Sequence, residues 1–148
     1  MEIRPAQAAD GPRIVELIRL LAEFEKLPPP DAAAERRLIA DAFEARRLEL
    51  WVAEEAGAVI AYAACFTAYS TFRARPTLFL EDLFVHPSAR RRGVATALLA
   101  RLRAEAEQRG CGRFEWMVLD WNVEAQKLYA GIGAAMLPEW RLVRIDLA

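Results

Sequence analysis

Residues 83–96 combine a strand-like run with a short basic loop and the start of a helix. The first N–H groups of a helix have no partner inside it, and their dipoles add up to roughly half a positive charge. A pyrophosphate placed there is stabilised by both effects, and Gly93 keeps a side chain out of its way. The alternative is that the arginines are only solvated charges beside a tight turn. The expected anion site comprises Arg90, Arg91, Arg92, Gly93, Val94, Ala95 and Thr96.

Two carboxylates, Glu81 and Asp82, interrupt the apolar run 77–85. An ionised carboxylate is costly there unless it is paired or faces a wet cleft. One interpretation is structural, with the carboxylates paired to arginines of neighbouring helices. The other is chemical: a carboxylate that faces a wet cleft can bind a cationic group and accept its proton. Both side chains reach one cleft only if a bulge interrupts the strand, because successive strand residues point to opposite faces.

Length and charge limit the possible functions. A chain of 148 residues has the size of one domain, so we predict a single domain over residues 1–148. Its 20 Lys and Arg against 21 Asp and Glu give a net charge of −1. Proteins that bind nucleic acids need surplus positive charge, so we expect no nucleic-acid partner.

The chain carries no sign of a membrane segment or of a metal site. No window approaches the roughly 18 apolar residues of a membrane helix, and residues 1–5 do not begin a signal peptide. We therefore expect a cytoplasmic protein without a membrane partner. His86 is the only histidine, and Cys65 and Cys111 lack the spacing of a zinc site or a disulfide framework. We predict free thiols and no bound metal.

The hydrophobic pattern predicts an α/β fold in which helices flank a mixed, mostly antiparallel central sheet. Asp10, Asp31 and Asn122 are expected to cap helices, and the three prolines 28–30 separate the first two helices. The tract 69–76 is predicted to be a polar loop. The order is βααβββαβαβ, with strands near 3–6, 50–53, 59–67, 77–85, 114–119 and 141–147, and a helix over 92–109.

Residues 90–95, Arg-x-x-Gly-x-Ala, resemble the segment with which acetyltransferases of the GNAT superfamily bind the pyrophosphate of coenzyme A. Further segments, in order along nearly the whole chain, are similar to the spermidine/spermine and thialysine N-acetyltransferase branch. The resemblance implies the GNAT fold, acetyl-CoA as cosubstrate, a small-molecule amine as acceptor, and a homodimer. The similar segments are 3–10, 21–25, 80–85, 121–122, 129–134 and 140–142.

The resemblance also implies roles for individual residues. Glu81 is implied to bind the amine and remove its proton through water, with a weaker part for Asp82. Tyr129 is implied to donate a proton to the departing thiolate, although a helical tyrosine is by default core filler. Asn122 and Ala125 are implied to contact the coenzyme.

Several further residues are expected to line the two substrates. A backbone amide freed by a splayed strand can bind the acetyl oxygen, and we nominate Leu83, Phe84 and Val85. The amine site is implied to include Phe24, Glu25, Glu115, Trp116 and Met117. An acid at Glu25 that reaches a distal ammonium would favour diamines, while the alternative is a solvated carboxylate at a helix end.

The chain departs from the resembled enzymes at two places. Ala130, Gly131 and Ile132 stand where those enzymes carry basic residues, and Arg73 and Arg75 lie in a loop where they keep an aromatic substrate contact. Only Phe72 remains as a candidate for that contact. Two positive charges near an entrance would repel a polyamine unless they point outward.

The predicted function is transfer of an acetyl group from acetyl-CoA to a primary amine of a diamine, polyamine or lysine-like small molecule. Two alternatives stay open. One is the same reaction on another amine, such as that of an amino acid, an aminoglycoside or a peptide. The other is a module that binds coenzyme A without catalysis.

Overall fold

The computed structural model describes all 148 residues, which form two compact units, 1–117 and 118–148. The second unit contains α4 (Val123–Gly131). The first contains β1 (Glu2–Pro5), η1 (Ala8–Asp10), α1 (Gly11–Glu25), α2 (Ala32–Phe43), β2 (Glu49–Glu55), β3 (Ala58–Ser70), β4 (Arg75–Val85), η2 (Pro87–Ala89), α3 (Val94–Gln108) and β5 (Arg113–Trp116).

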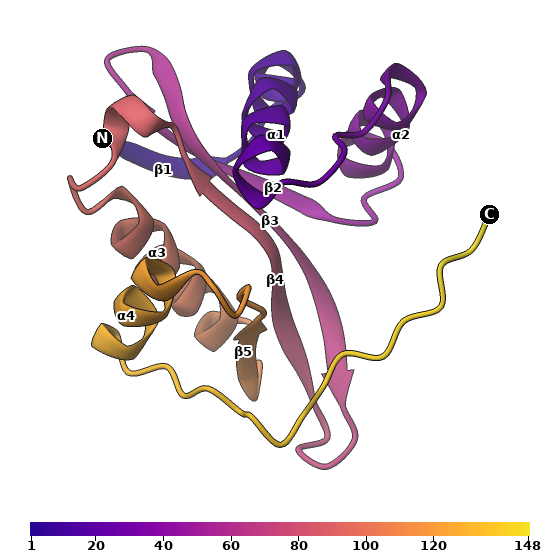
Figure 1. Cartoon of the computed structure of the whole chain (residues 1–148), viewed down its shortest axis with the longest axis vertical. Coiled ribbons are helices and arrows are strands. Elements are labelled where there is room, and N and C mark those ends of the chain that lie inside the picture. Colours follow the sequence, from indigo (N-terminus) through magenta and orange to yellow (C-terminus); the bar gives the residue numbers. More distant parts are fainter. The chain divides into compact units, whose positions relative to one another are not determined.

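The first unit is built on a five-stranded sheet in the order β1-β2-β3-β4-β5. Neighbouring strands are antiparallel from β1 to β4, while β4 and β5 are parallel. The parallel pair requires a crossover, which α3 supplies. Figure 1 shows α1 and α2 on one side of the sheet and α3 on the other. The predicted mixed, mostly antiparallel sheet flanked by helices is confirmed.

The core on the α1 and α2 face joins helix and strand side chains. Ile14 and Leu17 of α1 are wholly buried and pack in one cluster with Tyr62 of β3 and Phe84 of β4. The helix α2 begins where the sequence predicts, because the Asp31 carboxylate accepts a hydrogen bond of 2.8 Å from the Ala34 N–H. On the opposite face, α3 buries Leu98, Leu99, Leu102 and Ala106.

The predicted last strand, residues 141–147, is wrong, and the observed order is βααβββαβα. Val143 is 89% exposed and Leu147 equally so. A strand needs a partner for its backbone N–H and C=O groups, and the second unit offers only α4 and irregular chain. Alternation of side chains alone therefore does not form a strand here.

The predicted loop 69–76 is also wrong in extent, because β3 and β4 continue as a hairpin until Ser70 pairs with Arg75. Only residues 71–74 form the turn. The Ser70 hydroxyl accepts a hydrogen bond of 3.2 Å from the Arg73 N–H and helps to close the turn.

No helix of the chain combines the length and the apolar character needed to cross a bilayer.

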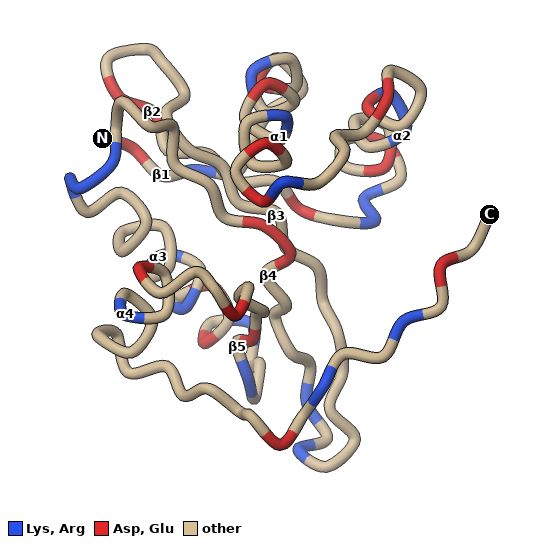
Figure 2. Tube along the Cα trace, viewed as in Figure 1, with Lys and Arg blue, Asp and Glu red and all other residues tan.

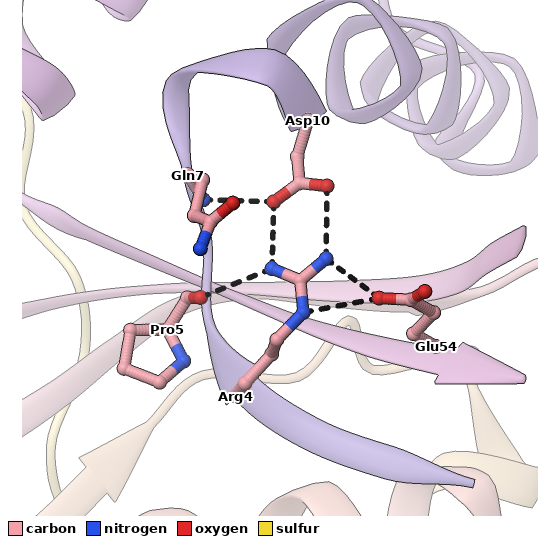
Figure 3. A network of polar contacts seen from close by, with 5 residues as sticks. All are labelled: Arg4, Pro5, Gln7, Asp10 and Glu54. Carbon is pink, nitrogen blue, oxygen red and sulfur yellow. Dashed lines mark hydrogen bonds and ion pairs between the residues drawn. The ribbon is translucent and has the colours of Figure 1, made fainter. Parts of the chain in front are cut away.

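Asp10 occupies the residue before α1, but its side chain does not cap that helix. Its carboxylate accepts hydrogen bonds from the Gln7 N–H at 2.7 Å and from Arg4 Nη1 at 2.8 Å (Figure 3). Arg4 also pairs with Glu54 of β2 at 2.7 Å, so one guanidinium joins β1, η1 and β2. The hydrogen bonds from Arg4 lower the pKa of Asp10 below its usual range.

We expect Arg4→Met to lower the free energy of unfolding at pH 7 by about 1–2 kcal/mol, between the values of exposed and buried ion pairs. The substitution leaves Asp10 and Glu54 without the cation that both share. Urea unfolding of both proteins measures the difference. Because the folded pKa of Asp10 is depressed, its contribution is present above the unfolded pKa of ~3.9 and is lost as pH falls through the folded value. The free energies of unfolding of the two proteins should therefore become equal at acid pH.

Arg103→Met is the matched control, because the Arg103 and Glu107 side chains are 68% and 66% exposed. It should change stability by less than about 0.5 kcal/mol. Equal urea midpoints for wild type and Arg4→Met at pH 7 would show that the Arg4 network contributes no net stability.

Candidate active site

A one-residue bulge in β4 determines how its carboxylates lie. Cys65 pairs with Leu80, and the preceding residue Ala64 pairs with Asp82, so Glu81 is an extra residue with no partner on β3. Side chains alternate regularly on either side of the bulge. Leu80 therefore lies on the α3 face, whereas Asp82 lies on the α1 face. The bulge that the sequence required for Glu81 and Asp82 to serve one cleft is present.

Asp82 is partly buried, and its nearest polar partner is a tyrosine. The Tyr62 hydroxyl donates a hydrogen bond of 3.0 Å to Asp82 Oδ2. Burial raises the pKa of Asp82 to about 6, the hydrogen bond from Tyr62 opposes that rise, and the charges of Glu81 and Glu25 add to it. Asp82 is thus an acid that titrates close to neutral pH.

Glu25, at the end of α1, completes a cluster of three carboxylates with Glu81 and Asp82, called the acidic cluster below. Burial, and then the charge of Glu81, raise the pKa of Glu25. No member of the cluster forms an ion pair with an arginine or lysine. The structural interpretation of Glu81 and Asp82, pairing with arginines, has no support in the structure. An unpaired acidic cluster is suited to binding a cation.

Next to the acidic cluster, the sheet opens along the outer edge of β4. The pairing of β4 with β5 ends at Leu80 and Trp116, whereas β4 continues to Val85. The His86 N–H donates to Ile60 O at 2.8 Å, toward β3. In an antiparallel pair, every second residue directs its N–H and C=O groups to the partner strand. Phe84 therefore directs these groups to β3, whereas Leu83 and Val85 direct theirs away from it. Of the three nominated amides, those of Leu83 and Val85 are directed away from β3.

The N-terminus of α3 has the features of an anion site. Gly93 precedes the helix in the left-handed region at φ 76° and provides no side-chain cap. The first helical hydrogen bond runs from the Ala97 N–H to Gly93 O, so Val94, Ala95 and Thr96 direct their N–H groups out of the helix. A Cβ added to Gly93 would meet nothing within 4 Å. These features fit a pyrophosphate, although the helix begins at Val94 and not at the predicted residue 92.

The arginines before α3 form one continuous basic stretch (Figure 2). Arg92 pairs with Glu55 at 3.2 Å on the surface. Arg90 is exposed as well, but its Nε donates to Val85 O at 3.2 Å, and its guanidinium lies 5.2 Å from the Phe84 ring centre and 5.5 Å from that of Phe24. Arg90 therefore links the end of α1 to the basic loop, and Arg91 is exposed at the surface like Arg90 and Arg92.

The other predicted site residues lie on β5 and α4. Register places Trp116 beside Leu80, next to the bulge, and Glu115 beside Phe79. Met117 follows the strand and is exposed. In the second unit, the Asn122 side chain accepts a hydrogen bond of 3.2 Å from the Ala125 N–H, which confirms its predicted capping role. Tyr129 is partly buried two turns further along α4.

The hairpin arginine Arg75 lies far from the acidic cluster along β4. Arg75 precedes Glu81 by six residues on an extended strand, which corresponds to ~20 Å. Charges that far apart are screened, since the Debye length is ~8 Å at physiological ionic strength. Phe72 is 93% exposed at the hairpin turn, nine residues from Glu81, and does not line the acidic cluster.

Tyr62 is the one member of this site that sequence analysis missed. It lies in an alanine-rich strand, 20 residues before Asp82. A buried tyrosine needs a partner for its hydroxyl, and this was the available signal. The sequence alone does not give the register that identifies the partner.

Residues 14–134 match the acetyltransferase (GNAT) family, across both units. The chain is 35% identical to a thialysine N-epsilon-acetyltransferase from Bos taurus, over 97% of the chain and 91% of the relative. It is 40% identical to the L-ornithine N5-acetyltransferase NATA1 from Arabidopsis thaliana, over 54% of the chain and 35% of the relative.

Two solved structures share the fold. A probable acetyltransferase superposes with a TM-score of 0.86 at 20% identity, over 100% of this chain and 99% of that one. AAC(6')-Iy, in complex with the bisubstrate analogue CoA-S-monomethyl-acetylneamine, has a TM-score of 0.81 at 23% identity, over 99% and 98%. Since the family match covers most of the chain and the bovine relative is similar over nearly its whole length, the chain belongs to the GNAT family of acetyltransferases.

Proposed function

We propose that the protein transfers the acetyl group of acetyl-CoA to a primary amine of a diamine, polyamine or lysine-like small molecule, within a ternary complex. The observation that carries the proposal is the acidic cluster of Glu25, Glu81 and Asp82, which has no cation of its own. Its charge favours a substrate with more than one ammonium group. The similarity to relatives named for an ε-nitrogen and an N5 nitrogen supports a lysine-like acceptor.

Acetyl-CoA is proposed to bind along the opened edge of β4. Its pyrophosphate would accept hydrogen bonds from the N–H groups of Val94, Ala95 and Thr96, with Arg91 and Arg92 adding charge. Its acetyl oxygen would accept a hydrogen bond from the outward N–H of Leu83 or Val85, which stabilises the oxyanion as the amine attacks.

The amine must lose a proton before it can attack the thioester carbon. Glu81, on the bulge, is proposed to hold the ammonium and to accept that proton through a water molecule. The amine nitrogen then bonds to the acetyl carbon, the nitrogen loses its second proton to solvent, and the tetrahedral intermediate collapses with loss of the coenzyme A thiolate. Tyr129 is proposed to protonate that thiolate, with Asn122 and Ala125 contacting the coenzyme. Phe24, Glu115, Trp116 and Met117 complete the proposed amine site.

We propose that both units act together as one acetyltransferase domain, because the family match runs through both. A cytoplasmic homodimer remains the expected form. The exposed, alternating apolar residues Val143, Ile145 and Leu147 support self-association, because a second copy could offer the backbone partner that they lack.

A thiol-release assay over a panel of amines tests the acceptor class. We expect turnover with spermidine, putrescine or lysine analogues such as thialysine, and weak turnover with monoamines of the same length, because the acidic cluster attracts a second ammonium. Turnover only with an aminoglycoside or a peptide would contradict the proposed acceptor class and favour the alternative, the same reaction on another amine. Binding of coenzyme A without any turnover would leave a non-catalytic module.

Glu81→Gln tests the proposed base. We expect kcat/KM for the amine to fall by about 10²–10⁴-fold, the usual contribution of a general base. The affinity for coenzyme A, measured by calorimetry, should stay the same, since Glu81 lies outside the anion site. The matched control is Glu107→Gln, an exposed glutamate on α3 that should leave kcat/KM unchanged. A Glu81→Gln enzyme with full activity would remove Glu81 from the mechanism.

Ala95→Asp tests the pyrophosphate site. A carboxylate in the first turn of α3 favours the helix through its dipole but competes with an anionic ligand for the same N–H groups. We expect the Kd for coenzyme A to rise at least tenfold while the Tm does not fall. Ala100→Asp places the same carboxylate at an exposed position further along α3 and should leave the Kd unchanged. Equal affinities in both variants would contradict this placement of the coenzyme.

A further inference from the structure

Tyr62 is held rigidly by the core, yet its hydroxyl reaches the acidic cluster. Its side chain is wholly buried and packs with Ile14, Leu17 and Phe84. Register pairs Tyr62 with Phe84 and places Asp82 diagonally across on the same face. The hydroxyl lies 3.0 Å from Asp82 Oδ2. A fixed ring therefore aims one hydrogen-bond donor at one carboxylate oxygen.

The other groups that face Asp82 are charges of the same sign. Glu25 approaches from the end of α1 and Glu81 from the bulge of β4, and both disfavour a charged Asp82. Arg90 lies over the Phe24 and Phe84 rings, but it forms no ion pair with the cluster. Of the groups contacting Asp82, only the Tyr62 hydroxyl favours its ionised form before a substrate arrives.

We propose that Tyr62 is a positioning residue of this acetyltransferase, which orients Asp82 and keeps it ionised as a second anchor for the cationic substrate beside Glu81. The proposal rests on the function proposed above. In this role, Tyr62 contacts neither substrate. Through Asp82, it affects the affinity for the amine and the acid limb of the pH dependence of kcat/KM.

The proposed chemistry benefits from a second carboxylate that stays charged. Glu81 becomes neutral when it accepts the proton of the amine. It then no longer attracts the ammonium group that a substrate with two amines still carries. A second carboxylate that stays charged retains the substrate while the proton leaves. Asp82 serves this purpose only above its own pKa of about 6. Loss of the Tyr62 hydrogen bond would raise that pKa toward the working pH.

Tyr62→Phe removes the hydroxyl and keeps the ring that fills the core. We expect the acid limb of kcat/KM for the amine to move upward by about one pH unit, the usual effect of one hydrogen bond to a charged group. At pH 6, KM for the amine should rise several-fold, while kcat changes little. At pH 8.5, where Asp82 is ionised in both proteins, kcat/KM for the amine should be the same in wild type and variant to within about twofold.

Two further variants separate this role from a general effect on folding. Asp82→Asn should remove the acid limb that belongs to Asp82, and the double variant Tyr62→Phe/Asp82→Asn should show no additional change, because Tyr62 acts through Asp82. Tyr69→Phe is the matched control at an exposed position of β3, 65% exposed, and should leave the profile unchanged. An acid limb at the same pH in wild type and Tyr62→Phe would overturn the proposal.

A measurement without turnover keeps this inference distinct from the proposed function. Carbon-detected NMR of the Asp82 carboxyl gives its pKa directly in wild type and in Tyr62→Phe. A higher pKa in the variant supports the coupling even if no amine in the panel is acetylated, in which case the proposed function alone fails. An unchanged pKa overturns the role of Tyr62 whether or not the enzyme turns over.

Discussion

The position of the charges in this site depends on one extra residue in β4. Because side chains alternate along a strand, removing Glu81 from the pairing with β3 transfers every later residue of β4 to the opposite face. Asp82 and Phe84 thereby face α1, and the Leu83 and Val85 backbones lie along the edge that β5 has left. A regular strand would place Asp82 on the α3 face, away from Glu25 and Tyr62.

The acidic cluster is tolerated because it lies where the sheet loses its neighbour. Three carboxylates without a cation repel one another, and burial adds to the cost for Asp82 and Glu25. The pairing of β4 with β5 ends at Leu80 and Trp116, Glu81 is exposed to solvent, and the Tyr62 hydroxyl offsets part of the cost for Asp82. A bound ammonium would relieve the rest, so the same repulsion that weakens the empty site favours a cationic ligand.

Local patterns predicted the elements, while pairing determined what they become. Asp31 caps its helix as expected, since a cap depends only on residues three positions apart. Asp10 has the same local signal, but Arg4 and Gln7 take its carboxylate. Residues 141–147 alternate like a strand and find no partner. The carboxylates of the site were predictable from polar residues in an apolar run, whereas Tyr62 depended on a register that no local pattern contains.

Opposite charges lie at the two ends of one strand segment, which suits the two substrates that we propose. Residues 81–85 span about 13 Å, with the acidic cluster at the start and the basic loop and α3 following the end. Acetyl-CoA carries its anionic pyrophosphate and its thioester at opposite ends of an extended arm. An arm fixed at the basic end and lying along β4 would extend its thioester toward the acidic end, where we propose that the cationic amine binds. Arg90 contacts Val85, Phe84 and Phe24 together, so one side chain joins the basic loop to the residues next to the acidic cluster.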